Sequence, residues 1–423
     1  MLRALVLHLH PKIVPAKTLR FSLTFGLGGM ALVLVLVLLA TGVLLLFAYE
    51  PSVEGAYESV AALRYDVPMG QFFRNVHRWA ANLALILVVV HMLRVAFTGA
   101  LHGGRRGNWM VGLALLALVA LSNFTGYLLP WDQVSYWAVT ISTGMLEYIP
   151  GVGRFLQRAI RGGDDVGRRT LSTFFVLHVV FVPVVLVTLL AVHFWLVRKA
   201  RGVVIPRARA DDPIERDPMV ATSPHLTHRE GAVALALLAV LAVLALLVDA
   251  PLAASANPGL SPNPAKAPWY FMGFQELLIH FHPLFAVVVF PALGLALLVG
   301  AARRESSAAE GVWFASPNGR RIATAAAVAG AVLTILGVLF DELVPDVANA
   351  FPGAPKLVTA GLVPFAATAC IGWGALHVLR RKYSASPEES ANAAFALGFS
   401  AFAALTLVGA AFRGAGMALT WPW

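Results

Sequence analysis

Nine apolar stretches alternate with polar segments along the chain. They lie near residues 21–48, 79–98, 109–129, 174–197, 231–250, 283–302, 321–340, 357–380 and 392–412. Each is long enough to cross the hydrocarbon core of a bilayer, about 30 Å thick, as one helix. Of the 423 residues, 59% are hydrophobic and 13% are charged, about half the charged share of soluble domains. The pattern predicts an all-α polytopic membrane protein, so the lipid membrane is an expected partner.

Positive charges gather in the polar segments on one side of the expected membrane. If the spans alternate, that side holds the N-terminus and the segments after the second, fourth, sixth and eighth spans, with runs such as RRGN at 105–108, VRKARG at 197–202 and LRRK at 379–382. An excess of Lys and Arg marks the cytoplasmic side. We therefore expect a cytoplasmic N-terminus and a first span that is retained rather than cleaved as a signal. Topology then explains the net charge of +10, and we expect no nucleic-acid partner.

Four histidines inside the apolar stretches form two matched pairs, His77 with His91 and His178 with His193, with steps of 14 and 15 residues. In a helix such a step covers about 21–22 Å and returns both side chains to roughly one face. Neutral imidazole is a common axial ligand of haem iron. We expect a four-helix bundle that holds two haems, an outer one on His77 and His178 and an inner one on His91 and His193. Proton relay and plain packing are the alternatives.

Four glycines have a matching spacing. Gly28 and Gly42 in the first stretch, and Gly112 and Gly126 in the third, are also 14 residues apart. A glycine lets a flat macrocycle approach the helix backbone, although small residues also serve helix packing. The agreement with the histidine step favours haem binding.

Two arginines lie near the expected ligands at the membrane edges. Arg74 precedes His77 by three residues, and Arg94 follows His91 by three. A guanidinium at either place could bind haem propionates, or could simply extend toward water. The single cysteine, Cys370, leaves no internal disulfide and no CxxCH attachment site, so we expect non-covalent haems.

The polar segment at 206–229 suggests four parts: a haem-binding domain at 1–205, a cytoplasmic linker at 206–229, C-terminal helices at 230–345 and further spans at 346–423. We expect four to five spans after the bundle. The outer loop at 132–173 contains MLEYIPGVGRFLQRAIRG, which predicts an interfacial helix. This loop carries arginines although it is expected on the outer side.

Three runs resemble one known family. They are FFRNVHRWAANLALILVVVHMLRV, NFTGYLLPWDQVSYWAVTI and LSTFFVLHVVFVPVVLVTLLAVHFWLVRKARG. They strongly resemble cytochrome b of the quinol–cytochrome c oxidoreductases, and the 15-residue histidine step is similar to that of the photosynthetic bf branch. The likeness is dense over about residues 20–205 and looser to about 345. The bf branch divides this protein into two polypeptides, whereas here both parts are joined.

The resemblance implies two non-covalent b-type haems, a low-potential outer one and a high-potential inner one. It implies quinol oxidation near the outer haem, with one electron passing to a Rieske iron–sulfur protein and the other to the outer haem, and quinone reduction near the inner haem. The expected function is that of the dihaem subunit of a proton-translocating quinol:cytochrome c oxidoreductase. Implied partners are the Rieske protein, a c-type cytochrome subunit, quinone and a second copy in a homodimer. The implied location is the bacterial inner (plasma) membrane.

The chain departs from the family at two further places. Gly26 aligns with the cysteine that attaches an extra haem in the bf branch, so we expect no covalent extra haem. The outer quinol motif Pro-Glu-Trp-Tyr reads APWY at 267–270, without a carboxylate. A quinol hydroxyl needs a base nearby, and a carboxylate with a raised pKa would serve. Glu276 is the candidate, with a structural carboxylate as its alternative and His280 or His282 as other proton acceptors.

The remaining site residues are carried over from the resemblance. Trp269, Tyr270 and Tyr136 correspond to the outer quinol pocket, and Arg198 corresponds to a basic residue of the inner quinone site. The missing glutamate makes menaquinol the expected quinol, with ubiquinol as the alternative.

Two other functions remain open at this stage. A dihaem membrane anchor of a quinone-linked dehydrogenase would need one quinone site and no Rieske protein, but it would lack the WYFMGFQEL segment and the 132–173 helix. A transporter or channel would bind no haem, and the few ionisable residues within the spans argue against it.

Overall fold

The computed structural model describes residues 10–205, 218–304, 310–344, 351 and 353–421. Within these residues, nine helical segments are long and apolar enough to cross a membrane. The predicted all-α polytopic fold is therefore confirmed. Residues 206–217 of the expected linker and the last two residues of the chain lie outside the described residues.

The chain forms two compact units. The first consists of the described parts of Met1–Trp131, Phe174–Ala253 and Ala302–Trp313, and the second of those of Asp132–Thr173, Ala254–Ala301 and Phe314–Trp423. This division differs from the expected boundaries at 205, 229 and 345. The outer loop belongs with the C-terminal helices, and the expected linker already contains the start of a helix at Thr222.

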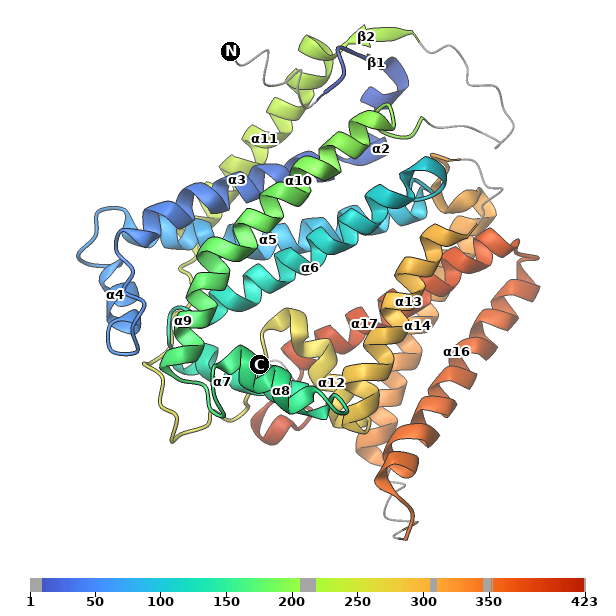
Figure 1. Ribbon diagram of the computed structural model, residues 1–423. Helices are drawn as coiled ribbons and strands as arrows, with labels where there is room; N and C mark the ends of the chain where they lie inside the picture. The colour runs from blue at the N-terminus through green and yellow to red at the C-terminus, as the bar shows by residue number, and fades with distance from the viewer. Residues whose placement is uncertain (1–9, 206–217, 305–309, 345–350, 352, 422–423) are drawn as a thin grey trace. The chain divides into compact units, whose positions relative to one another are not determined.

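The first unit is a bundle of long helices. They are α3 (Leu27–Leu46), α5 (Gly70–Phe97), α6 (Arg106–Leu128), α10 (Val182–Lys199) and α11 (Thr222–Leu247). Helix α3 packs along α5, and α6 packs along both α5 and α10 (Figure 1). Helix α11 packs here too, because its Leu241 and Ala245 are buried against Leu34, Ala80 and Ala84. Helix α11 thus packs within the first unit, whereas the sequence boundaries grouped it with the C-terminal helices.

Short elements complete the first unit. They are α2 (Phe21–Thr24), α4 (Ala56–Ala62) and the strands β1 (Ile13–Pro15) and β2 (Met219–Ala221), which pair antiparallel. The first span begins at Leu27 rather than near residue 21, because Phe25 and Gly26 adopt left-handed backbone angles, with φ of 51° and 67°, and end α2. Such angles interrupt a right-handed helix.

Among the residues that the structure describes, three spans contain a π-helical turn, at Leu177–Phe181, Phe285–Val289 and Leu357–Leu362. In each case the following α-helix has a proline at its second position: Pro183, Pro291 and Pro364. A proline has no N–H, and its ring collides with the carbonyl four residues earlier. That carbonyl lies inside the π turn each time, so the widened turn is the local response to the proline.

The second unit contains the remaining helices. They are α7 (Gln133–Gly144), α8 (Gly153–Arg161), α12 (Met272–His280), α13 (Phe290–Arg303), α14 (Pro317–Leu343), α16 (Val363–Lys382) and α17 (Pro387–Ala411), while α9 (Arg168–Val176) leads on toward α10. Helix α17 packs closely on α14 at Gly330, where a Cβ would strike the Leu397 backbone, and on α12 at Gly273, where it would strike Phe402. Both α17 and α7 begin with a capping box, on Ser386 and Asp132 respectively.

Candidate functional site

The two histidines of α5 lie against glycines of α3. Gly42 faces His77, and Gly28 faces His91; a Cβ added to either glycine would lie 3.3 Å from the Cε1 atom of the imidazole. Such a contact is tighter than an ordinary van der Waals separation. Both positions therefore favour glycine, because a side chain would press on the ring.

The same arrangement recurs between α6 and the helix that runs from α9 into α10. Gly126 faces His178, where an added Cβ would overlap the ring, and Gly112 faces His193, where it would lie 3.8 Å from Cε1. Each of the four sequence-predicted glycines therefore lies beside one of the four histidines. This correspondence results from the antiparallel packing of each helix pair, which brings the first glycine beside the second histidine and the second glycine beside the first.

The outer pair, His77 and His178, face each other across the bundle. Their ring centroids are 6.2 Å apart, and the ring planes are inclined by 75°. Two metal–nitrogen bonds of about 2 Å each, together with the ring radii, would place the centroids roughly 6 Å apart. Two imidazoles are too few for a structural zinc site, but they complete the coordination of an iron porphyrin.

Both outer imidazoles are held through their Nδ1 atoms. Nδ1 of His77 lies 2.9 Å from Oγ1 of Thr41, and Nδ1 of His178 lies 3.0 Å from the carbonyl oxygen of Ser122. A metal-binding histidine is commonly oriented in this way, with its other nitrogen directed at the metal. Neither Thr41 nor Ser122 could be predicted from the sequence, because neither lies near a ligand along the chain.

The π-helical turn explains the unequal histidine steps. His178 lies inside the turn at Leu177–Phe181, and His193 lies in the regular helix α10. At about 100° per residue, a 15-residue step would rotate the second imidazole about 100° further than a 14-residue step. The widened turn absorbs one residue, so the 15-residue step directs its two imidazoles much as the 14-residue step of α5 does.

The two arginines near the ligands have different environments. Arg74 donates from Nη1 to the carbonyl oxygen of Ala250 at 2.8 Å and from Nη2 to that of Pro251 at 2.6 Å. Arg94 is buried and donates from Nε to the carbonyl oxygen of Leu23 at 2.7 Å. Within the described residues, its buried Nη2 has no hydrogen-bond partner. Arg94 therefore offers a donor to an anionic group, and Arg74 is held by backbone carbonyls.

The WYF segment forms one 3-10 turn, Trp269–Phe271, directly before α12. The Trp269 and Tyr270 rings meet edge to face, with centroids 5.6 Å apart. Gln275 fixes the chain ahead of this turn, because its side chain accepts from the Ala267 N–H at 2.7 Å and donates to the Ala265 carbonyl at 2.9 Å. No sequence motif indicated this role of Gln275.

Tyr136 lies on α7 and is buried. Its hydroxyl donates to the carbonyl oxygen of Val166 at 3.2 Å. Burial, helped by the charge of Asp165 and opposed by that of Arg161, raises the pKa of Tyr136 above its ordinary value. The phenol is thus neutral at physiological pH and acts as a hydrogen-bonding group.

Glu276 is fully buried on α12 and forms an ion pair with Arg413, which follows α17. Burial alone would raise its pKa, but hydrogen bonds from His280 and Arg413 outweigh burial and hold the pKa of Glu276 below its ordinary value. The expected raised pKa at Glu276 is therefore wrong. The pKa of Glu276 is lowered because Arg413, which lies 137 residues away in sequence, donates hydrogen bonds to the carboxylate.

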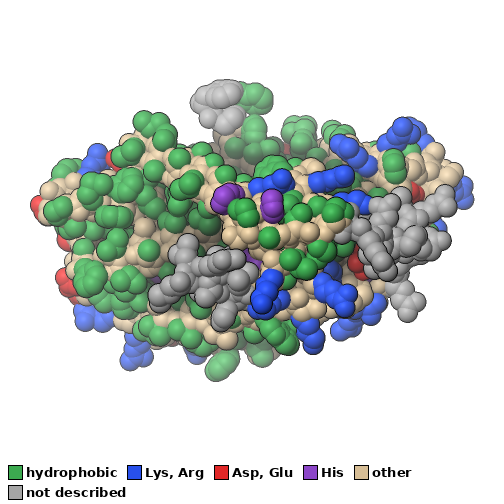
Figure 2. Space-filling model, turned by 90° about the horizontal axis from the view of Figure 1, so that it is seen from above, with side chains coloured by type: hydrophobic (Ala, Val, Ile, Leu, Met, Phe, Trp, Pro, Cys, Tyr) green, Lys and Arg blue, Asp and Glu red, His purple; other side chains and the backbone are tan. Residues whose placement is uncertain are grey.

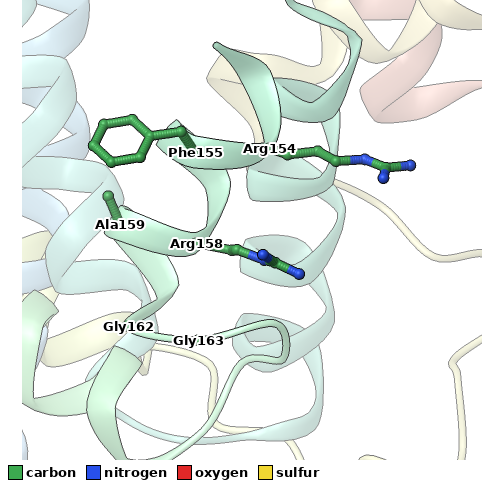
Figure 3. A pocket seen from close by; sticks show the side chains of 6 residues that line it. All are labelled: Arg154, Phe155, Arg158, Ala159, Gly162 and Gly163. Carbon is green, nitrogen blue, oxygen red and sulfur yellow. The ribbon is translucent and has the colours of Figure 1, made fainter. Parts of the chain in front are cut away.

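Helix α8 has two chemically distinct faces. Figure 3 shows Arg154 and Arg158 projecting to one side and Phe155 to the other. Phe155 is 72% exposed, while Arg161 is buried and donates to the Thr143 hydroxyl at 2.7 Å. A shallow hollow on this helix is lined by Arg154, Phe155, Arg158, Ala159, Gly162 and Gly163. An exposed aromatic ring beside arginines suits a helix that lies in a membrane interface.

Arg198 lies in the last turn of α10, five residues after His193, and is exposed. Seen from above the β1–β2 ribbon, the surface shows many Lys and Arg side chains and few acidic ones (Figure 2).

Apolar helices that present paired imidazoles against glycines define a membrane protein of the haem-binding, electron-transferring class. A family profile described as Cytochrome b/b6/petB matches residues 13–201. The chain belongs to the cytochrome b/b6 family, whose members bind haem b and transfer electrons within complexes of the bc or b6f type.

Relatives and a solved structure agree with this assignment. The chain is 40% identical over 178 residues to cytochrome b6 of Prochlorococcus marinus (strain MIT 9303), which is 42% of this chain and 82% of that protein. The same values hold for cytochrome b6 of Synechococcus sp. (strain CC9605). A chain of a hyperthermophilic respiratory Complex III has a similar fold, with a TM-score of 0.67 and 24% identity, covering 86% of this chain and 92% of that one. Because 86% of the chain is covered, this similarity of fold extends beyond residues 13–201 into the C-terminal half.

Proposed function

We propose that this chain is the dihaem subunit of a quinol:cytochrome c oxidoreductase that oxidises quinol at the outer side of the membrane, reduces quinone at the inner side and translocates protons. One observation carries the proposal: the fourfold repetition of an imidazole against a glycine of the neighbouring helix. Packing alone would not require glycine opposite every histidine.

The residues fit two non-covalent b-type haems. His77 and His178 would ligate the outer haem, and His91 and His193 the inner one, with about 21 Å between the two levels along α5. A bis-imidazole haem, when bound, accepts and releases one electron at a time. The glycines admit the flat group, Thr41 orients one ligand, and the buried Nη2 of Arg94 can bind a propionate.

No cysteine stands at position 26 for a covalent attachment. Gly26 has a φ of 67°, and an added Cβ would lie 3.2 Å from Val233. A larger residue there would be strained in its backbone and crowded by α11. We therefore propose that the chain carries no covalently attached third haem.

The two quinone sites would lie on opposite sides of the membrane. Trp269, Tyr270, Tyr136 and Glu276 are assigned to the outer, quinol-oxidising site, and Arg198 to the inner, quinone-reducing site. Menaquinol is the proposed substrate because APWY replaces the family motif at 267–270. The proposed partners are a Rieske protein, a c-type cytochrome subunit and a second copy of this chain, in a bacterial plasma membrane with the N-terminus inside.

Haem content provides the first test. The complex is purified, its haem is extracted and quantified, and its visible spectrum is followed during a redox titration. We expect two extractable b-type haems per chain with separate midpoint potentials. His178→Ala should remove the outer haem only, whereas the control His377→Ala, at a histidine stacked on Trp373 of α16, should keep both. A single haem, or ligation by any other side chain, would contradict the assignment.

Partner content and turnover test the reaction. The wild-type complex should reduce cytochrome c with menaquinol and should contain a Rieske iron–sulfur protein. A dehydrogenase subunit in place of the Rieske protein would instead establish the membrane-anchor alternative.

A further inference from the structure

Five charged side chains form a cluster at one end of the second unit. Glu276 and His280 come from α12, Asp341 and Glu342 from the last turn of α14, and Arg413 from the chain after α17. By the alternating topology, this end lies on the outer side of the membrane. The cluster connects two of the last three spans, α14 and α17, directly to the α12 segment that follows the WYF turn.

Arg413 holds the buried end of the cluster. Its Nε donates to Oε1 of Glu276 at 2.9 Å and its Nη2 to Oε2 at 2.8 Å, and both side chains have no exposed surface. Its Nη1 contacts Glu342 and donates to the Met417 carbonyl at 2.9 Å. Gly409 permits this approach, because an added Cβ would lie 3.0 Å from Cγ of Glu276. Glu276 is thus fixed as an anion, which makes it a poor first acceptor of a proton.

His280 connects the buried carboxylate to an exposed one. Its Nε2 lies 3.3 Å from Oε2 of Glu276, and its Nδ1 lies 2.6 Å from Oδ2 of Asp341. The side-chain exposure rises along this path from 0% at Glu276 to 7% at His280 and 54% at Asp341. Nε2 therefore faces the protein interior, and Nδ1 faces the surface.

The surroundings of Nε2 satisfy both protonation states of the ring. When Nε2 is protonated, it can donate to Glu276; when it is bare, it can accept from Nη2 of Arg413, which lies 3.1 Å away. Nδ1–H keeps Asp341 as its acceptor in either case. A purely structural histidine needs partners for one state only, whereas a group that takes up and releases protons needs partners for both.

We propose that His280 accepts the proton released by quinol and passes it through Asp341 to the outer surface, with Arg413 as the positioning residue. This inference rests on the proposed function. The O–H bond of quinol breaks, its proton binds Nε2 directly or through water, and the imidazolium releases the Nδ1 proton to the Asp341 carboxylate and then to water. Proton exchange with water, which removes the proton from Nε2 and returns one to Nδ1, restores the first tautomer. The electrons go to the acceptors of the proposed reaction.

The charges around His280 set the expected pH dependence. Glu276 acts from α12, Asp341 and Glu342 from α14, Arg413 from beyond α17, and Lys266, from the loop before α12, interacts with Glu276. Burial lowers the pKa of His280, but the two carboxylates outweigh burial and raise it above its ordinary value. The His280 ring thus loses its proton as the pH rises through this raised pKa, and the neutral ring can accept a proton from quinol. Quinol oxidation should therefore accelerate over that pH range.

The test compares His280→Gln and Asp341→Asn with the control His282→Gln in the whole complex. Quinol-driven haem reduction is measured across acidic to alkaline pH, in H₂O and D₂O, after the haem spectrum has shown correct assembly. His280→Gln should slow the reaction by about a hundredfold or more and abolish its alkaline rise. Asp341→Asn removes one of the two carboxylates that raise the pKa of His280, so the alkaline rise in rate should move to lower pH. His282→Gln should keep the wild-type profile, because Nδ1 of His282 accepts from the backbone N–H of Leu284 at 3.2 Å.

The outcomes separate the relay from the function on which it rests. If the wild type shows no quinol-driven haem reduction, the proposed function itself fails. If the wild type reacts and the His280 and Asp341 variants keep its rate and pH profile, only the relay is overturned, as it is if His282→Gln alters the profile equally. Should His280→Gln fail to assemble, Asp341→Asn still tests the relay. Asp341 is exposed, so this variant should assemble and the shift of its pH profile can be measured.

Discussion

Thr41 of α3 and His77 of α5 are joined by a hydrogen bond of 2.9 Å between Oγ1 and Nδ1. The Thr41 hydroxyl donates its single proton to the carbonyl oxygen of Val37 at 2.7 Å. It must therefore accept from Nδ1–H of His77. This contact fixes the tautomer and leaves the Nε2 lone pair of His77 available to a metal.

Removal of this bond should change the outer haem. Thr41→Val keeps the shape of the side chain but removes the acceptor, so the imidazole becomes a weaker donor to oxidised iron. We expect a higher midpoint potential for the outer haem and about tenfold or more weaker retention, measured by redox titration. Thr188→Val is the control, because exposed Thr188 makes the same backbone bond, to Val184 at 2.8 Å, without a histidine. Equal shifts in both variants would argue against a role for the Thr41–His77 bond.

Two adjacent glycines offer a matched test of the inner haem. A Cβ at Gly28 would lie 3.3 Å from the His91 ring, whereas a Cβ at Gly29 meets nothing within 4 Å. Gly28→Ala should displace His91 and lower the inner-haem content or shift its absorption band. Gly29→Ala should leave the haem spectrum unchanged. A normal spectrum for Gly28→Ala would show that the space beside His91 is not needed.

Arg94 should tune the inner haem through its charge. A cation beside a haem favours the reduced form, which carries one more negative charge. Arg94→Gln should therefore lower the midpoint potential of the inner haem, and Arg94→Lys, which keeps the charge, should preserve most of it. If the glutamine variant titrates like the wild type, Arg94 does not act on the haem.

The Glu276–Arg413 pair should govern stability as a function of pH. Because the pKa of Glu276 is lowered, its contribution is present above the ordinary carboxyl range and is lost as pH falls through the lowered value. Because the pKa of His280 is raised, its contribution is present below its ordinary pKa and is lost as pH rises through the raised value. Stability should thus be greatest between these limits.

Arg413→Gln would leave Glu276 as a buried, uncompensated charge. Breaking such a pair costs roughly 3–5 kcal/mol, so thermal unfolding of the complex should occur at a clearly lower temperature near neutral pH. The difference from the wild type should shrink as pH falls and Glu276 becomes protonated. A deficit that stays constant with pH would mean that Arg413 stabilises the fold by packing alone.

Much of the haem region could be predicted from the sequence because it depends on local periodicity. The helical repeat places residues 14 positions apart on one face, so the steps between His77 and His91 and between Gly28 and Gly42 were informative without a structure. The apolar stretches likewise predicted the spans. Their ends were less accurate where left-handed angles at Phe25 and Gly26 interrupt the helix.

The 15-residue step from His178 to His193 needed the structure. The sequence shows Pro183 but does not state how the helix accommodates it, because a proline can kink a helix, end it or widen one turn. Only the packed helix shows a π turn that contains His178. Similarly, α11 belongs to the first unit because of its buried contacts, which its apolar composition could not indicate.

The sequence by itself determined the membrane class, the spans, the family and the histidine–glycine periodicity, since each of these depends on residues close together in one chain segment. The tertiary structure alone decided the state of Glu276 and the connection from His280 to Asp341. Those properties depend on Arg413 and α14, which are distant in sequence, and the energy of a buried charge is set by the groups that surround it in space.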